Sequence, residues 1–228
     1  DTGWVQYGLL SRNNRFDIRD DRVMRVTVGG AFIHRDDLGF SDKDSGVRVR
    51  TNLNGRPYCI KDIPVLMQIP HHSQAPIVWQ MEKFEEEGEE TVIFRQVRLP
   101  RPARLDYPRP STYLEKGWTE FTTMAVAQLN GDLVGYIGIR ENIGTGVVWV
   151  SDLVVAESFR RQGIGSALVL SIQAWAVQLN LRMMTLEMQA KNYPMIRLAI
   201  KLGYKWSGFL DHYYPNLDIG LFFSRSLR

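Results

Sequence analysis

The sequence contains a single cysteine, Cys59, which excludes an intrachain disulfide framework and a zinc site built from several cysteines. It also lacks an apolar run of the about 18 to 20 residues that a membrane helix needs. The longest candidate, residues 167–179, is interrupted by Ser171 and Gln173. The first residues, 1–4, show neither the basic start nor the apolar stretch of a secretory signal. We therefore expect a soluble, cytoplasmic protein with no membrane partner, in which Cys59 is a small buried hydrophobe.

A strong excess of one charge sign is missing as well. The chain has 28 Lys and Arg against 25 Asp and Glu, a formal net charge of +3. Basic residues alternate with acidic ones and form no aromatic and basic face, so we expect no nucleic-acid partner. His71-His72 has no third ligand at metal spacing, and we expect no metal site. The content of 44% hydrophobic and 23% charged residues is typical of a folded protein and excludes a mostly disordered chain.

The first third of the sequence is polar and irregular. Within residues 1–75, the alternating runs 23–28 and 47–50 predict half-buried strands, and Asn54-Gly55 predicts a hairpin turn. Four prolines between residues 100 and 110 then predict an extended segment, because proline and the residue before it both resist helix.

From Phe121 onward the hydrophobic periodicity is regular. Glycine and asparagine turn signals separate the segments, and the apolar residues of two of them recur at helical spacing. The pattern predicts strands over 122–129, 133–140, 147–155, 183–188, 205–209 and 218–224, and helices over 163–179 and 193–202. This order indicates a mixed α/β fold with a helical crossover between the strands at 147–155 and 183–188.

The segment Arg160-Arg161-Gln162-Gly163-Ile164-Gly165-Ser166-Ala167 joins a buried strand to an amphipathic helix. Two glycines let a ligand approach the backbone, and the first amides of a helix together with two arginines favour an anion such as a pyrophosphate. No Gly-Lys-Ser/Thr follows Gly165, which excludes a Walker loop, and Leu168 replaces the third small residue of a dinucleotide fingerprint. The remaining alternatives are an Arg-x-x-Gly-x-Gly phosphate site and a tight glycine-rich turn without a ligand.

With its surroundings, this segment resembles the GNAT superfamily of acetyl-CoA-dependent N-acetyltransferases. The resemblance extends over residues 120–228 and rests on the runs 149–155 and 159–168, together with Leu186-Glu187, Asn192 and Leu202-Gly203-Tyr204. The tail, with Gly208-Phe209 and residues 218–223, looks like the streptothricin acetyltransferase branch.

The resemblance implies a GNAT fold, in which a mixed, mostly antiparallel central sheet is flanked by helices. We expect the GNAT domain to span residues 76–228 and residues 1–75 to form an N-terminal β-rich extension. We also consider a homodimer.

The resemblance implies acetyl-CoA as co-substrate and no metal. Amides of Arg161 to Ser166 would bind its pyrophosphate, and main-chain groups of Leu153 and Val155 would pair with the pantetheine arm like an added strand. Asn192 would contact the cofactor arm, although a plain helix cap is an equal alternative. The implied cofactor-binding residues are Leu153, Val154, Val155, Arg160, Arg161, Gln162, Gly163, Ile164, Gly165, Ser166 and Asn192.

The catalytic residues are less clear, because Ala199 stands where family members commonly place the tyrosine that protonates the departing thiolate. Tyr213, Tyr214, Tyr193 or water would have to replace it. The amide near Leu153 or Val154 would stabilise the oxyanion. The candidate catalytic residues are Glu187 and Asp152, as bases for the acceptor ammonium, and Tyr213. Alternatively, Asp152 is a strand-end hydrogen-bonding residue and Glu187 a structural partner of an arginine.

We therefore expect an N-acetyltransferase that acts by direct attack on the thioester and whose partner is a small-molecule amine acceptor, such as an amine antibiotic. A non-catalytic acyl-CoA sensor and a protein N-terminal or lysine acetyltransferase are the alternatives. The acidic run Glu85–Glu90 would attract a polycationic acceptor, but such runs are mostly solvated loops or helix faces.

Overall fold

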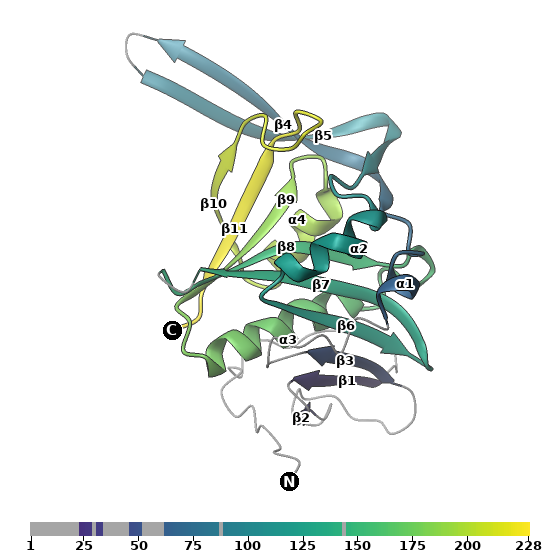
Figure 1. Ribbon diagram of the computed structural model, residues 1–228. Coiled ribbons are helices and arrows are strands. Elements are labelled where there is room, and N and C mark those ends of the chain that lie inside the picture. Colours follow the sequence, from purple (N-terminus) through teal and green to yellow (C-terminus); the bar gives the residue numbers. More distant parts are fainter. Residues whose placement is uncertain (1–22, 29–30, 34–45, 52–61, 87–88, 143–144) are drawn as a thin grey trace. The chain divides into compact units, whose positions relative to one another are not determined.

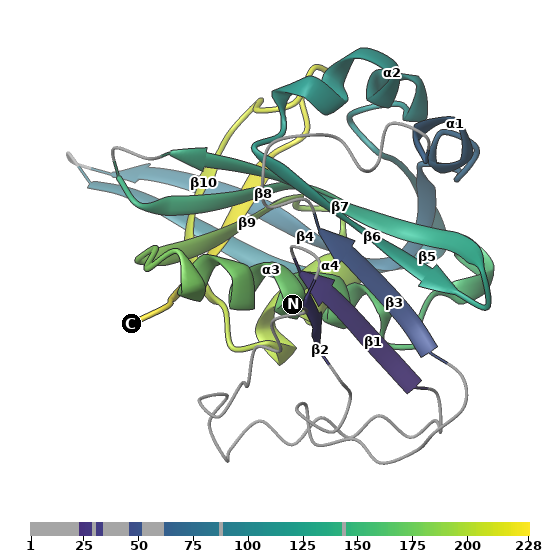
Figure 2. The same ribbon diagram turned by 60° about the horizontal axis from the view of Figure 1, so that its bottom comes forward.

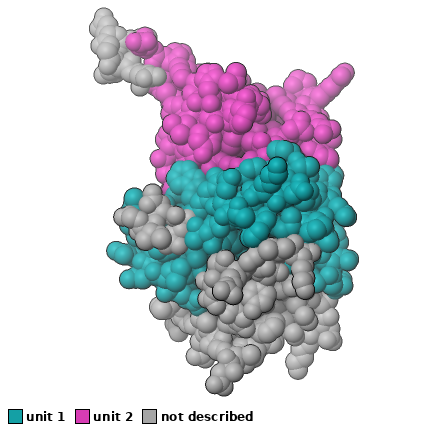
Figure 3. Space-filling model, viewed as in Figure 1, with its two compact units in different colours: residues 1–70, 110–185, 226–228 teal, residues 71–109, 186–225 magenta. Residues whose placement is uncertain are grey.

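The computed structural model describes residues 23–28, 31–33, 46–51, 62–86, 89–142 and 145–228. The chain divides into two compact units, which have separate colours in Figure 3. Unit 1 comprises residues 1–70, 110–185 and 226–228, and unit 2 comprises residues 71–109 and 186–225. The predicted hairpin at Asn54-Gly55 and the predicted burial of Cys59 lie outside the described residues. The predicted domains 1–75 and 76–228 follow a different division and stay a prediction.

Unit 1 is built on strands in the order β8-β7-β6-β3-β1-β2. Strand β7 pairs antiparallel with β6 and β8, and β3 pairs antiparallel with β6, whereas β1 runs parallel to β3. The bounds are β1 Val23–Val28, β2 Ala31–Ile33, β3 Gly46–Thr51, β6 Thr123–Leu129, β7 Asp132–Asn142 and β8 Val147–Val155. The predictions of strands at 23–28 and 47–50 are thus confirmed, as are those at 122–129, 133–140 and 147–155.

The turn between β6 and β7 shows why the sequence predicts this hairpin well. Leu129 pairs with Asp132, and the two residues between them are Asn130 at φ 51° and Gly131 at φ 97°. Both central positions therefore lie in the left-handed region that a two-residue hairpin turn requires, and asparagine and glycine are the residues that reach it at least cost.

Helices cover the two faces of the unit 1 strands. Figure 2 shows α3 (Ile164–Gln178) on one side of β6, β7 and β8, and α1 (Ile63–Leu66) and α2 (Leu114–Gly117) on the other. The buried stripe of α3 includes Ile164, Leu168 and Ile172, each at most 1% exposed. Leu179, expected to continue this stripe, is 49% exposed because the helix ends one residue earlier. Short 3₁₀ segments lie at Ser111–Tyr113, Trp118–Glu120 and Glu157–Phe159.

Unit 2 contains the strand order β10-β11-β9 and a separate two-stranded sheet of β4 and β5. Its elements are β4 His72–Glu86, β5 Glu89–Asp106, β9 Met183–Gln189, α4 Tyr193–Lys201, β10 Lys205–Leu210 and β11 Gly220–Ser226. Strand β9 begins in unit 1 and continues into unit 2. The predicted strand, helix and two further strands over 183–224 are confirmed with end shifts of one or two residues.

The β4–β5 pair was not predicted as a hairpin. It runs from His72↔Asp106 to Glu86↔Glu89, and Figure 1 shows its far end extending beyond β10 and β11. Of the acidic run, residues 85–86 end β4 and residues 89–90 begin β5, so these four positions are in strands and not on a helix face, while residues 87–88 lie outside the described residues.

Aromatic side chains attach this strand pair to the rest of unit 2. The Phe94 ring lies 5.2 Å from that of Phe209, and the Trp79 ring lies 6.3 Å from that of Phe223. The backbone N–H of Trp79 donates to the carbonyl of Ala190 at 3.0 Å. A two-stranded hairpin is marginal in water on its own, so these contacts hold the base of the pair.

Candidate functional site

The junction between β8 and α3 has the backbone geometry of an anion site. Gly163, the N-cap of α3, has φ 86°, and Arg161 also has a positive φ of 64°. No side chain caps α3 within the part of the chain that the structure describes. Successive amides around left-handed residues form a concave nest, and the first helical amides lack intrahelical acceptors. Together they can bind a phosphate group.

The two arginines of this junction differ in their surroundings. Arg160 donates from Nε to the carbonyl of Val155 at 2.9 Å, which ties the loop back to the end of β8. Burial lowers the pKa of the Arg160 guanidinium, and the charge of Glu157 opposes that shift. Arg161 is exposed. Arg161 is therefore the better placed of the two to meet a solvent-borne anion, while Arg160 positions the loop.

The end of β8 leaves part of its strand accessible. Leu153 and Val155 are partly exposed, whereas Val154 between them is 5% exposed. Gly135 pairs with Val155, and a Cβ on Gly135 would lie 2.6 Å from the carbonyl oxygen of Val154. The two backbones therefore approach each other at a spacing that only glycine permits.

Asp152 lies at a bulge in the same strand. Gly138 pairs with Asp152 and Ile139 with Val150, so Ser151 is an extra residue. Ser151 Oγ donates to Asp152 Oδ2 at 2.8 Å, and both residues are 2% exposed. The buried carboxylate thus takes a hydrogen bond at the strand, as the alternative interpretation of Asp152 expected.

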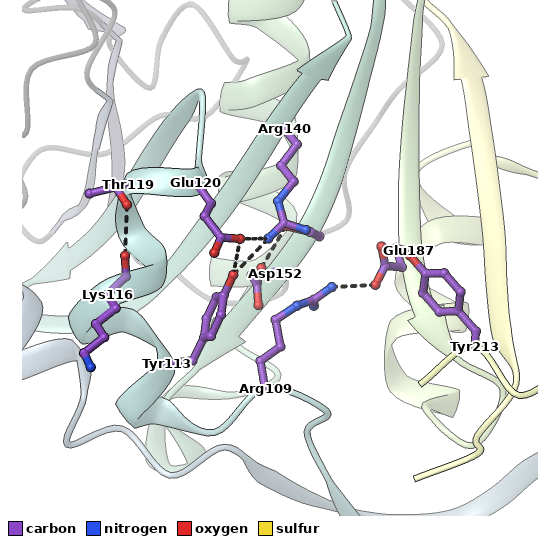
Figure 4. Close-up of polar contacts among 10 residues, drawn as sticks. Arg109, Tyr113, Lys116, Thr119, Glu120, Arg140, Asp152, Glu187 and Tyr213 are labelled. Atoms are coloured by element: carbon purple, nitrogen blue, oxygen red, sulfur yellow. Dashed lines mark hydrogen bonds and ion pairs between the residues drawn. The ribbon is translucent and has the colours of Figure 1, made fainter. Parts of the chain in front are cut away.

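In unit 2 the predicted catalytic residues Glu187 and Tyr213 are hydrogen-bonded to each other, and Arg109 pairs with Glu187 (Figure 4). Arg109 Nη2 donates to Glu187 Oε1 at 2.8 Å, and Tyr213 Oη donates to Glu187 Oε2 at 3.1 Å. The Glu187 side chain is only 1% exposed and that of Arg109 is 18% exposed. A buried carboxylate needs a paired charge, and the arginine provides it. The interpretation of Glu187 as the partner of an arginine is confirmed as a contact.

Two adjacent tyrosines flank this carboxylate in different ways. Tyr213 is 37% exposed, whereas Tyr214 is 5% exposed, and their rings lie 4.8 Å apart. Burial, and next the charge of Glu187, raise the pKa of Tyr214. Tyr214 is therefore a neutral, buried group at neutral pH, and Tyr213 is the more exposed of the two residues.

Asp218 fixes the loop that carries both tyrosines. Its side chain accepts from Gln189 Nε2 at 2.8 Å and Asn216 Nδ2 at 2.9 Å, and it forms an ion pair with Lys191. Its carbonyl accepts the backbone N–H of Tyr214 at 3.2 Å. These contacts of the buried Asp218 restrict the loop, although the sequence pattern did not single out Asp218.

The remaining residues considered from the sequence lie at the start of α4 or within it. Asn192 Oδ1 accepts the backbone N–H of Met195 at 3.2 Å, so the cap interpretation of Asn192 is confirmed, and its contact with a cofactor stays a prediction. Ala199 is fully buried, and no proton donor exists at that position. Tyr193 begins the helix and is partly exposed.

A second polar cluster lies within unit 1 and includes none of the predicted residues (Figure 4). Arg140 Nη2 donates to Glu120 Oε2 at 2.8 Å and to Tyr113 Oη at 3.0 Å, and the Tyr113 hydroxyl donates to Glu120. Arg140 also lies 6.0 Å from the centre of the Phe121 ring. The elements around Tyr113 and Glu120 are single helical turns without a periodic signal, so the sequence alone could not bring these residues together.

The predicted site residues thus form two groups. Residues 152–155 and 160–166 belong to unit 1, and Glu187, Asn192 and Tyr213 belong to unit 2. Among the described residues, no group of three or more His, Cys, Asp or Glu could hold a metal ion. No helix in the described ranges is long and apolar enough to cross a membrane.

Family models match two parts of the chain. One described as the acetyltransferase (GNAT) family matches residues 90–204, and a family of unknown function, DUF7193, matches residues 1–109. Over 102 residues the chain is 36% identical to an N-alpha-acetyltransferase of Sulfurisphaera tokodaii, covering 40% of this chain and 61% of that protein. The chain therefore spans less than two thirds of the length of this relative.

Two solved structures resemble the fold over most of this chain. Nourseothricin acetyltransferase superposes with a TM-score of 0.64 at 20% identity, covering 80% of this chain and 99% of that chain. A structure described as a candidate streptothricin acetyltransferase from Bacillus anthracis strain Ames, in complex with acetyl coenzyme A, gives a TM-score of 0.60 at 17% identity, covering 79% and 99%. At these identities the likeness concerns the fold, and it confirms the predicted fold class.

Proposed function

We propose that this chain, which belongs to the acetyltransferase (GNAT) family, transfers an acetyl group from acetyl-CoA to a primary amine of a small molecule. The family model matches residues 90–204, which are 115 of the 228 residues. The observation that carries the proposal is the junction of β8 and α3. There, left-handed Arg161 and Gly163 precede a helix without a side-chain cap. Such a junction suits a pyrophosphate.

In this proposal the amides of residues 161–166 bind the cofactor pyrophosphate, and Arg161 adds a full positive charge. The partly exposed end of β8, at Leu153 and Val155, pairs with the amide groups of the pantetheine arm. Glycine at 135 supports this arrangement because it lets β7 approach β8 closely.

The proposed reaction is direct transfer. The deprotonated acceptor nitrogen attacks the thioester carbonyl, a C–N bond forms, and the C–S bond breaks to release the CoA thiolate. A backbone amide near Leu153 or Val154 stabilises the oxyanion. The ammonium proton passes to a base, for which Glu187 and Asp152 are the candidates, directly or through water. With alanine at position 199, water protonates the thiolate, or Tyr213, Tyr214 or Tyr193 does.

A small-molecule acceptor is the first choice because two structures that resemble the fold over most of this chain are described by antibiotic acceptors. A protein N-terminus is the second candidate, which the 36% identity to an N-alpha-acetyltransferase favours. The buried alanine at position 199 keeps a third candidate open, an acyl-CoA sensor without turnover.

The test is release of free CoA thiol from acetyl-CoA with a panel of small amines and of peptides with free N-termini, in direct competition. We expect turnover on at least one small primary amine and a preference for it over the peptides. Preferential acetylation of peptides would move the assignment to the second candidate. Tight binding of acetyl-CoA without release on any acceptor would support the sensor.

A further inference from the structure

We propose that Glu187 is a positioning residue that holds the loop between β10 and β11, residues 211–219, and that it is not the base of the reaction. This loop carries Tyr213 and Tyr214, and contacts from outside the loop fix its conformation. The inference rests on the proposed function, because it removes one of the two carboxylates considered as the base.

Both oxygens of Glu187 already accept hydrogen bonds (Figure 4). Oε1 accepts from Arg109 at 2.8 Å and Oε2 accepts from Tyr213 at 3.1 Å, and the Glu187 side chain is 1% exposed. A general base must come within hydrogen-bond reach of the proton that it takes, directly or through one water. An acceptor amine would have to displace Arg109 or Tyr213 to reach this carboxylate.

Uptake of a proton by Glu187 would also weaken its ion pair. The Arg109 side chain is 18% exposed and stays charged, so a neutral Glu187 would remove the opposite charge at 2.8 Å. The loss of one charge from a buried ion pair is strongly destabilising. The pair therefore suits a permanent contact better than proton uptake in every catalytic cycle.

The Tyr213 side chain connects the loop to two strands. Its ring lies 5.4 Å from the ring of Phe222 in β11, and a Cβ on Gly220 would lie 2.7 Å from the Tyr213 ring. Glycine at position 220 thus lets the ring pack directly on the backbone of β11. The Tyr213 hydroxyl donates to Glu187 in β9. Ring and hydroxyl together fix the first half of the loop.

The backbone of the loop explains why it needs these contacts. His212 has φ 51° and Leu217 has φ 63°, and this left-handed region is a strained conformation for leucine. Leu217 is 65% exposed, so burial of its side chain offsets little of the strain. Strained residues persist only where surrounding contacts fix them. The side-chain contacts of Asp218 fix the end of the loop, and the contact between Tyr213 and Glu187 fixes its start.

The first test observes the loop directly and needs no turnover. Two amides report on it, since the Tyr214 N–H donates to the Asp218 carbonyl at 3.2 Å and the Leu217 N–H donates to the Tyr214 carbonyl at 2.8 Å. In the full-length chain we expect Tyr213→Phe to speed hydrogen exchange at both amides about tenfold, because it removes a hydrogen bond to a charged group. Tyr193→Phe, which removes a hydroxyl at the start of α4, is the matched control and leaves both rates unchanged. Equal rates in Tyr213→Phe and the unmodified protein overturn the inference.

The second test asks whether Glu187 takes the proton. We expect Glu187→Gln to lower kcat/KM for the amine by less than about tenfold and to keep the fall in rate at acidic pH, whereas loss of a general base costs about 100- to 10,000-fold. A loss of that size with a rate that no longer depends on acidic pH makes Glu187 the base and overturns the inference. Where Glu187→Gln does not fold, the double variant Arg109→Met, Glu187→Gln decides by the same criterion, because it removes both charges of the pair. If the unmodified protein acetylates no amine, the proposed function fails instead, and hydrogen exchange still decides whether Glu187 holds the loop.

Discussion

Ala199 shows how one side chain limits the chemistry that the fold can perform. The residue is fully buried in α4. Its methyl group cannot donate a proton, and the packing around it leaves no room for a larger side chain. We expect Ala199→Tyr to destabilise the protein by about 1–3 kcal/mol through overpacking and to leave kcat unimproved. Thermal unfolding and thiol release, with Ala199→Ser as the control for a small change, measure both effects. A tenfold gain in kcat without loss of stability would show that the site accepts the missing acid.

Tyr204 predicts how stability depends on alkaline pH. Burial raises the pKa of Tyr204 above its ordinary value of 10.0, and the charge of Arg225 opposes the shift. Because the folded state holds this proton more tightly than the unfolded state, its contribution is complete below pH 10 and falls as the pH rises further. We expect the unfolding free energy to decline relative to Tyr204→Phe by about 1.4 kcal/mol per pH unit above pH 10. A difference between the two proteins that stays constant from pH 8 to 11 contradicts this assignment.

At the scale of elements, Asn192 combines a cap with a predicted cofactor contact. Its side chain accepts the Met195 N–H at the start of α4. We expect Asn192→Ala to cost about 1 kcal/mol of stability, whereas Asn192→Asp keeps the cap. The aspartate variant loses the amide donor, so we expect it to bind acetyl-CoA about 3- to 10-fold more weakly. If Asn192→Asp binds acetyl-CoA with the affinity of the unmodified protein, Asn192 acts only as a helix cap.

The elements also show what the sequence could and could not predict. Strand β8 and helix α3 follow from apolar runs bounded by glycine, and their bounds agree with the prediction within one residue. The β4–β5 pair escaped prediction because the acidic run at its end resembles a solvated helix face, and the register Glu86↔Glu89 became clear only in the structure.

The candidate site shows the same division between local and long-range information. The junction at Gly163 is local in sequence, so its motif predicts the passage from strand into helix, and the structure adds the left-handed backbone of Gly163. Arg109 and Glu187 are separated by 78 residues, and neither periodicity nor spacing links them. A single chain reveals the arginine partner of a buried carboxylate only when the fold brings the two together.

At the scale of the whole molecule, the residues proposed for the reaction are divided between the two units. The junction proposed to bind phosphate belongs to unit 1 and the Arg109–Glu187–Tyr213 cluster to unit 2. A ligand that binds only the folded protein stabilises it by mass action, by about 2.7 kcal/mol at a concentration of 100 Kd. We therefore expect acetyl-CoA to raise the melting temperature of the full chain. A melting curve that acetyl-CoA does not shift at millimolar concentration would contradict cofactor binding by the folded protein.

The most direct test of the central claim is calorimetric titration of acetyl-CoA into the unmodified protein, Gly163→Asp and Gly163→Asn. Asparagine and aspartate both tolerate the left-handed backbone found at φ 86° and have nearly the same size, so the pair isolates the effect of a negative charge. If the junction binds the pyrophosphate, the aspartate variant binds about 100-fold more weakly than the asparagine variant, with both folded. Equal affinity of the aspartate variant and the unmodified protein would place the cofactor elsewhere and remove the basis of the proposed function.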